Sequence, residues 1–390
     1  MKFLVLGGGT QGSAAAYDLL RAPDVEGVIV ADRATVSPLP FLQEFLERGL
    51  SVEQLDVTRV DEVRERMAGV DAVLCALPFA FNYEMSRLAV ECGVHFTDLG
   101  GNTEIVTRQR SLDGAARAAG VSVIPDCGLA PGLVNILTQR GIDRLDSVES
   151  VRMWVGGLPQ HPRPPLNYQT VYSLEGVLDY YTTSGLVLRE GEPLKVESLS
   201  GIEEVIFPEP IGVLEAFHTA GGASTLPGRY RGRIRTMEYK TLRYPGHARL
   251  MRDIRELGLL DEAPVEVDGA SVRPRSLFIE KVGPKLREGD GRDVVVLRIE
   301  VEGVKDRCST AVGYELVELY DERTGITAMM RCTGFSLSLT ALMQARGEVL
   351  EDGVRTPDEA VPPDAFIRGL EARGIQIRET VPGGPGGSGG

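Results

Sequence analysis

The chain begins with Lys2-Phe-Leu-Val-Leu-Gly-Gly-Gly-Thr-Gln-Gly12, a short apolar run that passes directly into a glycine turn. Gly7, Gly9 and Gly12 fit the pattern G-x-G-x-x-G, in which the first glycine allows a tight turn. The second lets backbone N–H groups approach a pyrophosphate, and the third lets the next helix pack on the strand. The stretch predicts a dinucleotide site at the N-terminus of a helix. A glycine-rich turn that binds nothing is the alternative.

A second apolar run, Gly27-Val-Ile-Val-Ala-Asp32, bears on which dinucleotide binds. The Asp32 carboxylate, about 20 residues after the turn, would accept hydrogen bonds from ribose hydroxyls and repel a 2′-phosphate. Arg33 could instead pair with that phosphate. We predict NAD as the cofactor, in preference to NADP.

Composition sets the broad class of the protein. A chain of 390 residues exceeds one ordinary core, so two domains are expected. Its formal net charge of −14 argues against nucleic acid as a partner. No apolar run is long enough to span a bilayer, and the early first strand leaves no room for a signal peptide. The five cysteines form no C-x-x-C pair, which predicts reduced thiols, a cytoplasmic protein and no metal site.

Strand and helix patterns alternate through about residue 125. Apolar runs predict strands at Phe3–Leu6, Val28–Ala31, Ala72–Leu77, Val94–Thr97 and Val121–Ile124. Helical spacing lies between them, at Ser13–Leu20, Phe41–Arg48, Val60–Met67, Tyr83–Cys92 and Ser111–Ala119. This alternation predicts an α/β fold with a doubly wound parallel Rossmann sheet and helices on both faces.

Polar residues follow the predicted strands, at the edge where such sheets bind ligands. Asp56 could touch the adenine amino group, and the backbone at Leu77 and Pro78 would line the middle of the cofactor. Asp98 and Asp126 end the fourth and fifth strands, which favours a functional role. Each of these acids could instead be a helix N-cap or a turn former.

The second region predicts an α+β domain. Strands are expected at Val148–Val155, Asp293–Glu302, Gly313–Leu319 and Gly325–Arg331, the last two joined by a hairpin-like turn at Tyr320–Thr324. Consecutive strands of this kind predict a mixed sheet with antiparallel pairs. Helices are expected at 131–143, at 335–349, returning to the first domain, and at 363–373. The domains are then 1–130 with helix 335–350, 131–334 for substrate and dimerisation, a 350–380 appendix, and a flexible Gly-rich tail at 381–390.

Three segments carry a resemblance to a known family. Asp126-Cys-Gly-Leu-Ala-Pro-Gly-Leu-Val-Asn135 fits D-x-G-x-x-P-G-x-x-N, and the others are Gly156–Tyr168 and Glu238–His247. Together they resemble the lysine 6-dehydrogenase branch of the saccharopine dehydrogenase-like superfamily, over about residues 1–350. The resemblance implies a Rossmann domain paired with an α+β domain, and homodimers. It implies NAD-dependent oxidative deamination of the lysine ε-amine to the 6-semialdehyde, which cyclises, with release of ammonia.

The resemblance also implies the site residues. The pyrophosphate would be bound by Gly7, Gly9, Thr10, Gln11 and Gly12, and the rest of the cofactor by Asp32, Asp56, Leu77, Pro78 and Thr97. Asp98 and Asp126 would lie near the nicotinamide and the substrate, and the second domain would contribute Lys240, Thr241, Arg243 and His247.

The chemistry of amine oxidation suggests roles for these residues. Hydride can leave the carbon only when the nitrogen is unprotonated, so a base is required. Asp126, His247 and Lys240 are the catalytic candidates, and Arg243 suits the carboxylate of an amino-acid substrate. The simpler interpretations are solvated surface charges for Lys240 and Arg243, and a turn histidine for His247.

Two further residues could contact substrate. Tyr168 ends a proline-rich loop and could line the pocket, and His218 precedes a polar loop that could close over it. One competing hypothesis is a saccharopine-type enzyme that forms or cleaves a secondary amine, which would need additional arginines near Asp98 and Asp126. Another is a dinucleotide-binding sensor without turnover.

Overall fold

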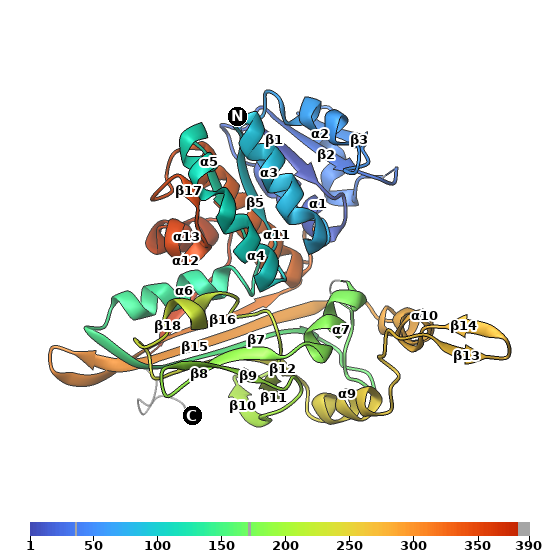
Figure 1. The fold of residues 1–390 in the computed structure, drawn as a ribbon, viewed down its shortest axis with the longest axis vertical. Coiled ribbons are helices and arrows are strands. Elements are labelled where there is room, and N and C mark those ends of the chain that lie inside the picture. Colours follow the sequence, from blue (N-terminus) through green and yellow to red (C-terminus); the bar gives the residue numbers. More distant parts are fainter. Residues whose placement is uncertain (36, 171–172, 381–390) are drawn as a thin grey trace. The chain divides into compact units, whose positions relative to one another are not determined.

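The structure is a computed structural model that describes residues 1–35, 37–170 and 173–380 (Figure 1). Unit 1 comprises Met1–Asp143, Asp321–Ile326 and Met330–Ile377, and unit 2 comprises Arg144–Tyr320, Thr327–Met329 and, at the end of the described residues, Arg378–Thr380. The predicted Gly-rich tail at 381–390 lies outside the described residues. No helix in the described ranges is long and apolar enough to cross a membrane.

Unit 1 is built on a seven-stranded parallel sheet in the order β17-β6-β5-β4-β1-β2-β3. The strands are β1 Lys2–Leu6, β2 Gly27–Asp32, β3 Leu50–Gln54, β4 Ala72–Cys75, β5 His95–Asp98, β6 Ser122–Ile124 and β17 Gly353–Val354. The strand order reverses between β1 and β4, as in a doubly wound Rossmann sheet. The predicted parallel sheet is therefore confirmed, and β17 extends it beyond β6.

The other elements of unit 1 are helices and short turns. They are α1 Thr10–Leu20, α2 Val60–Met67, α3 Asn82–Cys92, α4 Thr103–Gln109, α5 Asp113–Ala119, α6 Leu133–Asp143, α11 Ala328–Ala345, α12 Pro357–Ala360 and α13 Pro363–Glu371, with short 3-10 turns at Pro40–Phe45, Phe79–Phe81 and Arg110–Leu112. One core cluster joins buried residues of α2, α3 and α5 to the sheet, among them Val63, Leu88 and Phe96. The returning helix α11 packs on α1, where Tyr17 and Phe335 stack at 6.3 Å and Ser338 donates to Asp18 at 2.6 Å.

The predicted strand at Gly325–Arg331 is wrong, although the chain does turn where the hairpin-like turn was predicted, between Asp321 and Ile326. Only an isolated bridge joins Asp321 to Ile326, and α11 begins at Ala328. The reason is a cap from far along the chain, because the Asp293 carboxylate accepts the backbone N–H of Ala328 at 2.6 Å and of Met329 at 2.8 Å. These bonds satisfy donors that a helix start leaves open.

Unit 2 contains a nine-stranded mixed sheet whose main path runs β10-β11-β12-β7-β15-β16-β18. The strands are β7 Ser147–Pro159, β8 Gly185–Arg189, β9 Glu192–Val196, β10 Glu203–Phe207, β11 Gly212–His218, β12 Thr236–Arg243, β15 Asp293–Lys305, β16 Cys308–Leu319 and β18 Arg378–Thr380. β12 and β7 are parallel, whereas β7, β15 and β16 pair antiparallel. The predicted α+β domain with a mixed sheet is confirmed.

The remaining elements of unit 2 are α7 Leu174–Thr182, α8 Leu226–Arg229, α9 His247–Glu256, α10 Pro274–Leu286 and the separate hairpin of β13 Val265–Val267 and β14 Ala270–Val272. Two apolar clusters form around the sheet. Residues of α7, α9 and α10 pack with Phe217 of β11, whereas Trp154, Leu214 and Leu242 belong to another cluster.

Candidate functional site

The glycine turn after β1 has the geometry that a bound dinucleotide requires. Gly7 has a φ of +101°, and a Cβ on it would lie 2.8 Å from the Ala76 carbonyl oxygen. A Cβ on Gly12 would lie 1.9 Å from the Gly7 carbonyl oxygen, so this glycine is required where the helix packs on the turn. Gly9 is exposed, and a Cβ there would meet no heavy atom of the described chain within 4 Å. Its backbone is therefore open to a ligand.

The start of α1 fits an anion. Gly9 is its N-cap, and among the described residues no side chain caps this end and no acid occupies the first turn. Both amide atoms of Gln11 are buried without a hydrogen-bond partner in the described structure. Helix N–H groups and an unsatisfied amide are suited to phosphate oxygens, and Thr10 lies exposed beside them. The residues present therefore fit the pyrophosphate of a dinucleotide.

Asp32 ties the end of β2 to this turn. Its Oδ2 accepts the Gly8 N–H at 2.8 Å and its Oδ1 accepts the Ala34 N–H at 2.9 Å. A carboxylate has about four acceptor positions, so these two bonds leave capacity for ribose hydroxyls. The geometry places Asp32 beside the glycines, as the sequence predicts.

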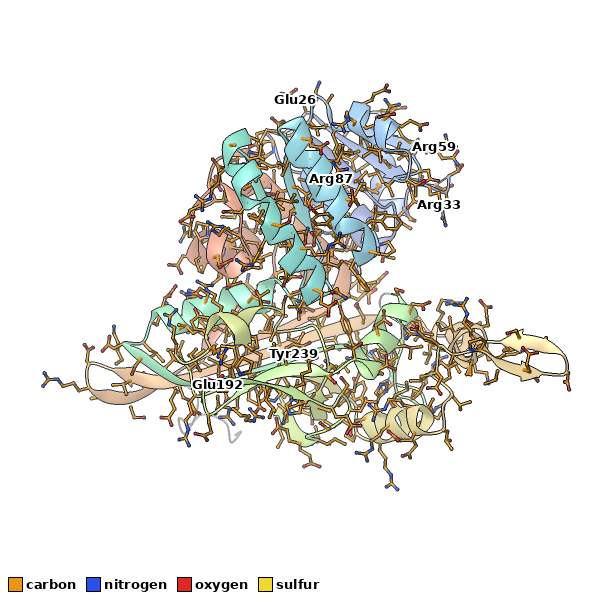
Figure 2. The ribbon with its side chains drawn as sticks, viewed as in Figure 1. Glu26, Arg33, Arg59, Arg87, Glu192 and Tyr239 are labelled. Carbon is orange, nitrogen blue, oxygen red and sulfur yellow. The ribbon has the colours of Figure 1, made fainter. Side chains whose placement is uncertain are left out.

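Positively charged residues lie near the ends of β2 and β3, where the adenosine of a dinucleotide is expected. Asp56 accepts the backbone N–H and the hydroxyl of Thr58, and these hydrogen bonds are the main cause that lowers its pKa. Arg33 and Arg59, labelled in Figure 2, lower the same pKa through their charges. Two guanidinium groups near the β2–β3 edge could attract a 2′-phosphate, which opposes the effect of Asp32.

The remaining predicted cofactor residues, Leu77, Pro78 and Thr97, differ in their exposure and contacts. The Leu77 side chain would be 3.4 Å from a Cβ at Gly7, so it borders the turn, and Pro78 is exposed after it. Thr97 is fully buried, and its hydroxyl donates to the Ile124 carbonyl at 2.9 Å, which joins β5 to β6.

Asp98 and Asp126 lie together at the ends of β5 and β6. Asp98 is fully buried and accepts the Gly100 N–H and the Gln109 side chain, both at 2.7 Å, and the Asp126 N–H at 3.3 Å. Burial raises the pKa of Asp98 to about 6. Asp126 has a φ of +66°, and its Oδ1 would lie 1.8 Å from a Cβ on Gly100. Asp98 thus holds the backbone that presents Asp126.

The segment from Asp126 to Asn135 comprises the turn after β6 and the first residues of α6. A Cβ on Gly132 would lie 2.1 Å from the Gly128 carbonyl oxygen, and the Asn135 side chain accepts the Gly132 N–H at 2.9 Å. Close backbone packing therefore accounts for the glycines and the asparagine of this motif.

The predicted residues of the second domain fall on two faces of the sheet in unit 2. In the register, Thr241 aligns with Phe217 and Val155, whereas Lys240 aligns with His218 and Trp154. Successive residues of a strand point to opposite faces. The structure brings Arg243 together with Tyr168 and His247, but it does not bring Lys240 and His218 to them.

Arg243 is the centre of the first group. It is 4% exposed, and its Nε donates to the Tyr181 hydroxyl at 3.2 Å while its Nη1 donates to the Leu242 carbonyl at 2.8 Å. Its guanidinium carbon lies 4.8 Å from the centre of the Tyr168 ring. Thr241 lies on the same face and shares a hydrogen bond of 2.8 Å with Thr219. Sequence reasoning missed Tyr181, for which the apolar spacing of α7 was the available signal.

His247 opens α9 and is enclosed. Its Nδ1 lies 2.9 Å from the Leu166 carbonyl oxygen and its Nε2 lies 3.0 Å from the Tyr181 hydroxyl. Burial, and then the charge of Arg243, lower its pKa to about 3. The ring is neutral and both nitrogens have protein partners, so this geometry gives His247 an internal role. Its catalytic role stays a prediction.

The second group is an ion-pair cluster. Lys240, with a side chain 7% exposed, lies 3.0 Å from Glu203, which also accepts the Trp154 indole N–H at 2.8 Å. His218 Nε2 lies 3.9 Å from Glu238, and burial and then the Lys240 charge lower the pKa of His218. An ammonium has no lone pair with which to accept a proton. The ion pair therefore gives no support to Lys240 as a base.

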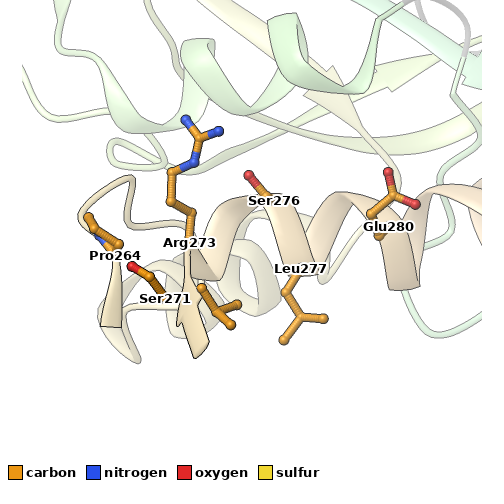
Figure 3. Close-up of a pocket in the computed structure, with 7 residues that line it drawn as sticks. Pro264, Ser271, Arg273, Ser276, Leu277 and Glu280 are labelled. Atoms are coloured by element: carbon orange, nitrogen blue, oxygen red, sulfur yellow. The ribbon is translucent and has the colours of Figure 1, made fainter. Parts of the chain in front are cut away.

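The polar loop after His218 is packed inside, since Thr219, Ala223 and Ser224 are 5%, 5% and 7% exposed. A hollow of about 520 Å³ (Figure 3) is lined by Pro264, Ser271, Val272, Arg273, Ser276, Leu277 and Glu280. None of the predicted site residues lines it.

In the described part of the chain, no group of three His, Cys, Asp or Glu residues could hold a metal ion.

Comparison with known families covers nearly the whole chain. Residues 3–124 match the saccharopine dehydrogenase NADP binding domain, and residues 128–375 match the saccharopine dehydrogenase C-terminal domain. This chain belongs to the saccharopine dehydrogenase family. The predicted superfamily is thereby confirmed, whereas the lysine 6-dehydrogenase branch is not.

Individual relatives are distant. Saccharopine dehydrogenase [NADP(+), L-glutamate-forming] of Saccharomyces cerevisiae is 23% identical over 72% of this chain and 64% of the relative. The mitochondrial alpha-aminoadipic semialdehyde synthase of Rattus norvegicus is 23% identical over 67% of this chain and 28% of the relative. The chain thus spans less than two thirds of these relatives.

Solved structures share the fold. The apo saccharopine dehydrogenase (L-Glu forming) of S. cerevisiae has a TM-score of 0.80 at 19% identity, over 97% of this chain and 99% of that one. The homospermidine synthase of Legionella pneumophila, in complex with NAD, has a TM-score of 0.69 at 11% identity, over 97% and 91%. The names of the family model and of the S. cerevisiae relative both mention NADP, and the solved structure that carries NAD shares only the fold.

Proposed function

We propose that this protein is a nicotinamide-dependent oxidoreductase that cleaves or forms the C–N bond of a saccharopine-type secondary amine. The observation that carries the proposal is the pair of family matches over residues 3–124 and 128–375. The open backbone at Gly9 and the uncapped start of α1 support a dinucleotide in unit 1.

The reaction balances without a further co-reactant. In the oxidative direction, hydride leaves the carbon that bears the nitrogen, and the resulting iminium adds water. The carbinolamine then collapses to an aldehyde and a primary amine, and one proton is released. The dinucleotide, when bound, supplies the hydride acceptor, and the chain's own residues bind and orient the substrate and move protons.

Two residues take distinct roles in this proposal. Arg243 binds a substrate carboxylate, because a guanidinium matches a carboxylate with two parallel hydrogen bonds. Asp126 moves the proton that the amine and the added water must lose. Its support is its place after a strand end beside a second buried acid, Asp98, whose pKa is raised by burial to about 6.

A second candidate is oxidative deamination of the lysine ε-amine. It is favoured by the segments Gly156–Tyr168 and Glu238–His247, which resemble that branch. The steps are the same, except that ammonia leaves instead of an amino acid. For either substrate we propose NAD as the preferred cofactor, because Asp32 lies at the glycine turn.

The test is an assay of the purified protein with saccharopine or lysine, each with NAD or NADP. Reduced cofactor, glutamate and ammonia are measured separately. Saccharopine should yield glutamate and reduced NAD in equal amounts, with no ammonia. Ammonia from lysine, with no glutamate from saccharopine, would support the second candidate, and no cofactor reduction with either substrate would overturn both.

A further inference from the structure

We infer that Tyr181 and His247 are positioning residues that fix the Arg243 guanidinium in the orientation that receives a substrate carboxylate. The inference rests on the proposed function, in which Arg243 binds that carboxylate. It goes beyond it by assigning roles to two residues that need not touch the substrate.

Contacts with Tyr181, Leu242 and Tyr168 restrain the guanidinium. Nε donates to Tyr181, Nη1 donates to the Leu242 carbonyl, and the Tyr168 ring lies against the charged carbon at 4.8 Å. The hydrogen bonds restrict the rotation of the planar guanidinium, and the Tyr168 ring restricts its movement toward the ring. A guanidinium held in this way has its N–H donors fixed in one direction, whereas the ammonium group of a lysine rotates freely.

The donor and the acceptor of each hydrogen bond in the series from Arg243 to Leu166 follow from the chemistry of the groups. The Leu166 carbonyl only accepts, so Nδ1 of His247 carries the hydrogen and Nε2 is the acceptor. Tyr181 must then donate its hydrogen to Nε2, which leaves its oxygen to accept from Arg243. The order Arg243 to Tyr181 to His247 to Leu166 has a matched donor and acceptor at each step.

The neutral state of His247 keeps this order. A protonated imidazole would donate from both nitrogens, and Tyr181 would lose the acceptor for its hydrogen. Among the described residues, Tyr168 and Tyr181 contact the ring, and the Glu215 carboxylate accepts the backbone N–H groups on either side of it. The charge of Arg243 opposes protonation of the ring.

Packing holds both positioning residues in place. Tyr181 and His247 are 1% and 2% exposed, and Phe217 stacks on the imidazole with ring centres 6.3 Å apart. Glu215 fixes the start of α9, because it accepts the N–H of Gly246 at 2.9 Å and of Ala248 at 2.5 Å. The orientation of Arg243 is therefore set jointly by β12, α7 and α9.

The test compares Tyr181→Phe with Tyr244→Phe. Tyr244 is a matched control, because its hydroxyl also makes a hydrogen bond in unit 2, to the Pro159 carbonyl at 3.0 Å. Tyr181→Phe should raise KM for the amino-acid substrate about tenfold, as expected for a weakened charge-assisted bond, with kcat and dinucleotide affinity unchanged. Tyr244→Phe should leave all three unchanged.

Chemical rescue separates positioning from simple structural support. Free guanidinium should restore substrate affinity to Arg243→Ala, because Tyr168 and Tyr181 still form its binding place. The double variant Arg243→Ala, Tyr181→Phe should not be rescued. Equal rescue in both, or an unchanged KM in folded Tyr181→Phe, would overturn the inference while leaving the role of Arg243 intact.

Two outcomes complete the test. An unchanged KM in Arg243→Ala would refute the proposed carboxylate role itself. Should Tyr181→Phe not fold, His247→Gln serves instead, because its amide can donate to Leu166 and accept from Tyr181. It should keep KM near that of the native protein, whereas His247→Leu should raise it, and equal KM values in these two folded variants would overturn the inference.

Discussion

Replacing Gly9 with alanine separates ligand binding from stability within a single turn. The added Cβ meets nothing within 4 Å in the described structure, and the φ of −70° suits any L-residue. Reduced freedom of the unfolded chain should stabilise the variant by about 0.4–1 kcal/mol. Alanine is less favourable than glycine at an N-cap by a similar amount, about 0.5 kcal/mol. We therefore expect the free energy of unfolding to stay nearly constant.

The dinucleotide should bind much more weakly to the same variant. The methyl group would occupy the space through which backbone N–H groups reach the pyrophosphate. Each hydrogen bond to a charged group contributes about 1.5–3 kcal/mol, and about 1.4 kcal/mol corresponds to a tenfold change in Kd. Loss of one or two such bonds, about 1.5–6 kcal/mol, predicts a Kd that is higher by about 10- to 10⁴-fold.

The assay is calorimetric titration with NAD, combined with thermal unfolding. Gly114→Ala is the control, because this exposed helical glycine also has nothing within 4 Å in the described structure, and it should leave the Kd unchanged. Gly12→Ala should instead lose about 1–3 kcal/mol of stability, since its Cβ would lie 1.9 Å from the Gly7 carbonyl oxygen. A Gly9→Ala protein with native affinity would refute the proposed binding at this turn.

Three further variants test individual carboxylates. Asp32→Ser should lower the affinity for NAD relative to NADP, because the charge that repels a 2′-phosphate is lost, and an unchanged ratio of the two Kd values would remove Asp32 from the site. Asp126→Asn should lower turnover by about 10²- to 10⁴-fold, whereas near-native kcat would reduce Asp126 to a turn residue. Burial raises the pKa of Asp98 to about 6, so the folded state binds this proton more tightly than the unfolded state. Relative to Asp98→Asn, the native protein should therefore gain up to about 3 kcal/mol of stability in urea unfolding as the pH falls from about 7 to about 4, and parallel pH profiles would contradict this.

The first sheet was predictable because its signals are local. The run into Gly7 through Gly12 specifies strand, turn and helix in consecutive residues, and the structure has them there. β17 was missed because two residues, Gly353 and Val354, carry no periodicity, and only their pairing with β6 makes them a strand. The start of α11 was misplaced because its cap, Asp293, lies far away in the sequence.

The second half of the candidate site could be predicted only in part. Lys240 and Arg243 are close in sequence, but the two-residue period of β12 turns them to opposite faces. Without β12 recognised as a strand, the segment could not be divided in this way. Tyr181 joins Arg243 and His247 only through the packing of α7 and α9 beside β12, which no local pattern encodes.

The most direct test follows the hydride itself. Saccharopine in which both hydrogens on the carbon that becomes the aldehyde are replaced by deuterium is incubated with the protein and NAD, and the reduced cofactor is analysed by mass spectrometry. We predict one deuterium in each reduced cofactor, with one glutamate released for each. Unlabelled reduced cofactor, or release of glutamate without cofactor reduction, would contradict oxidation at that C–N bond.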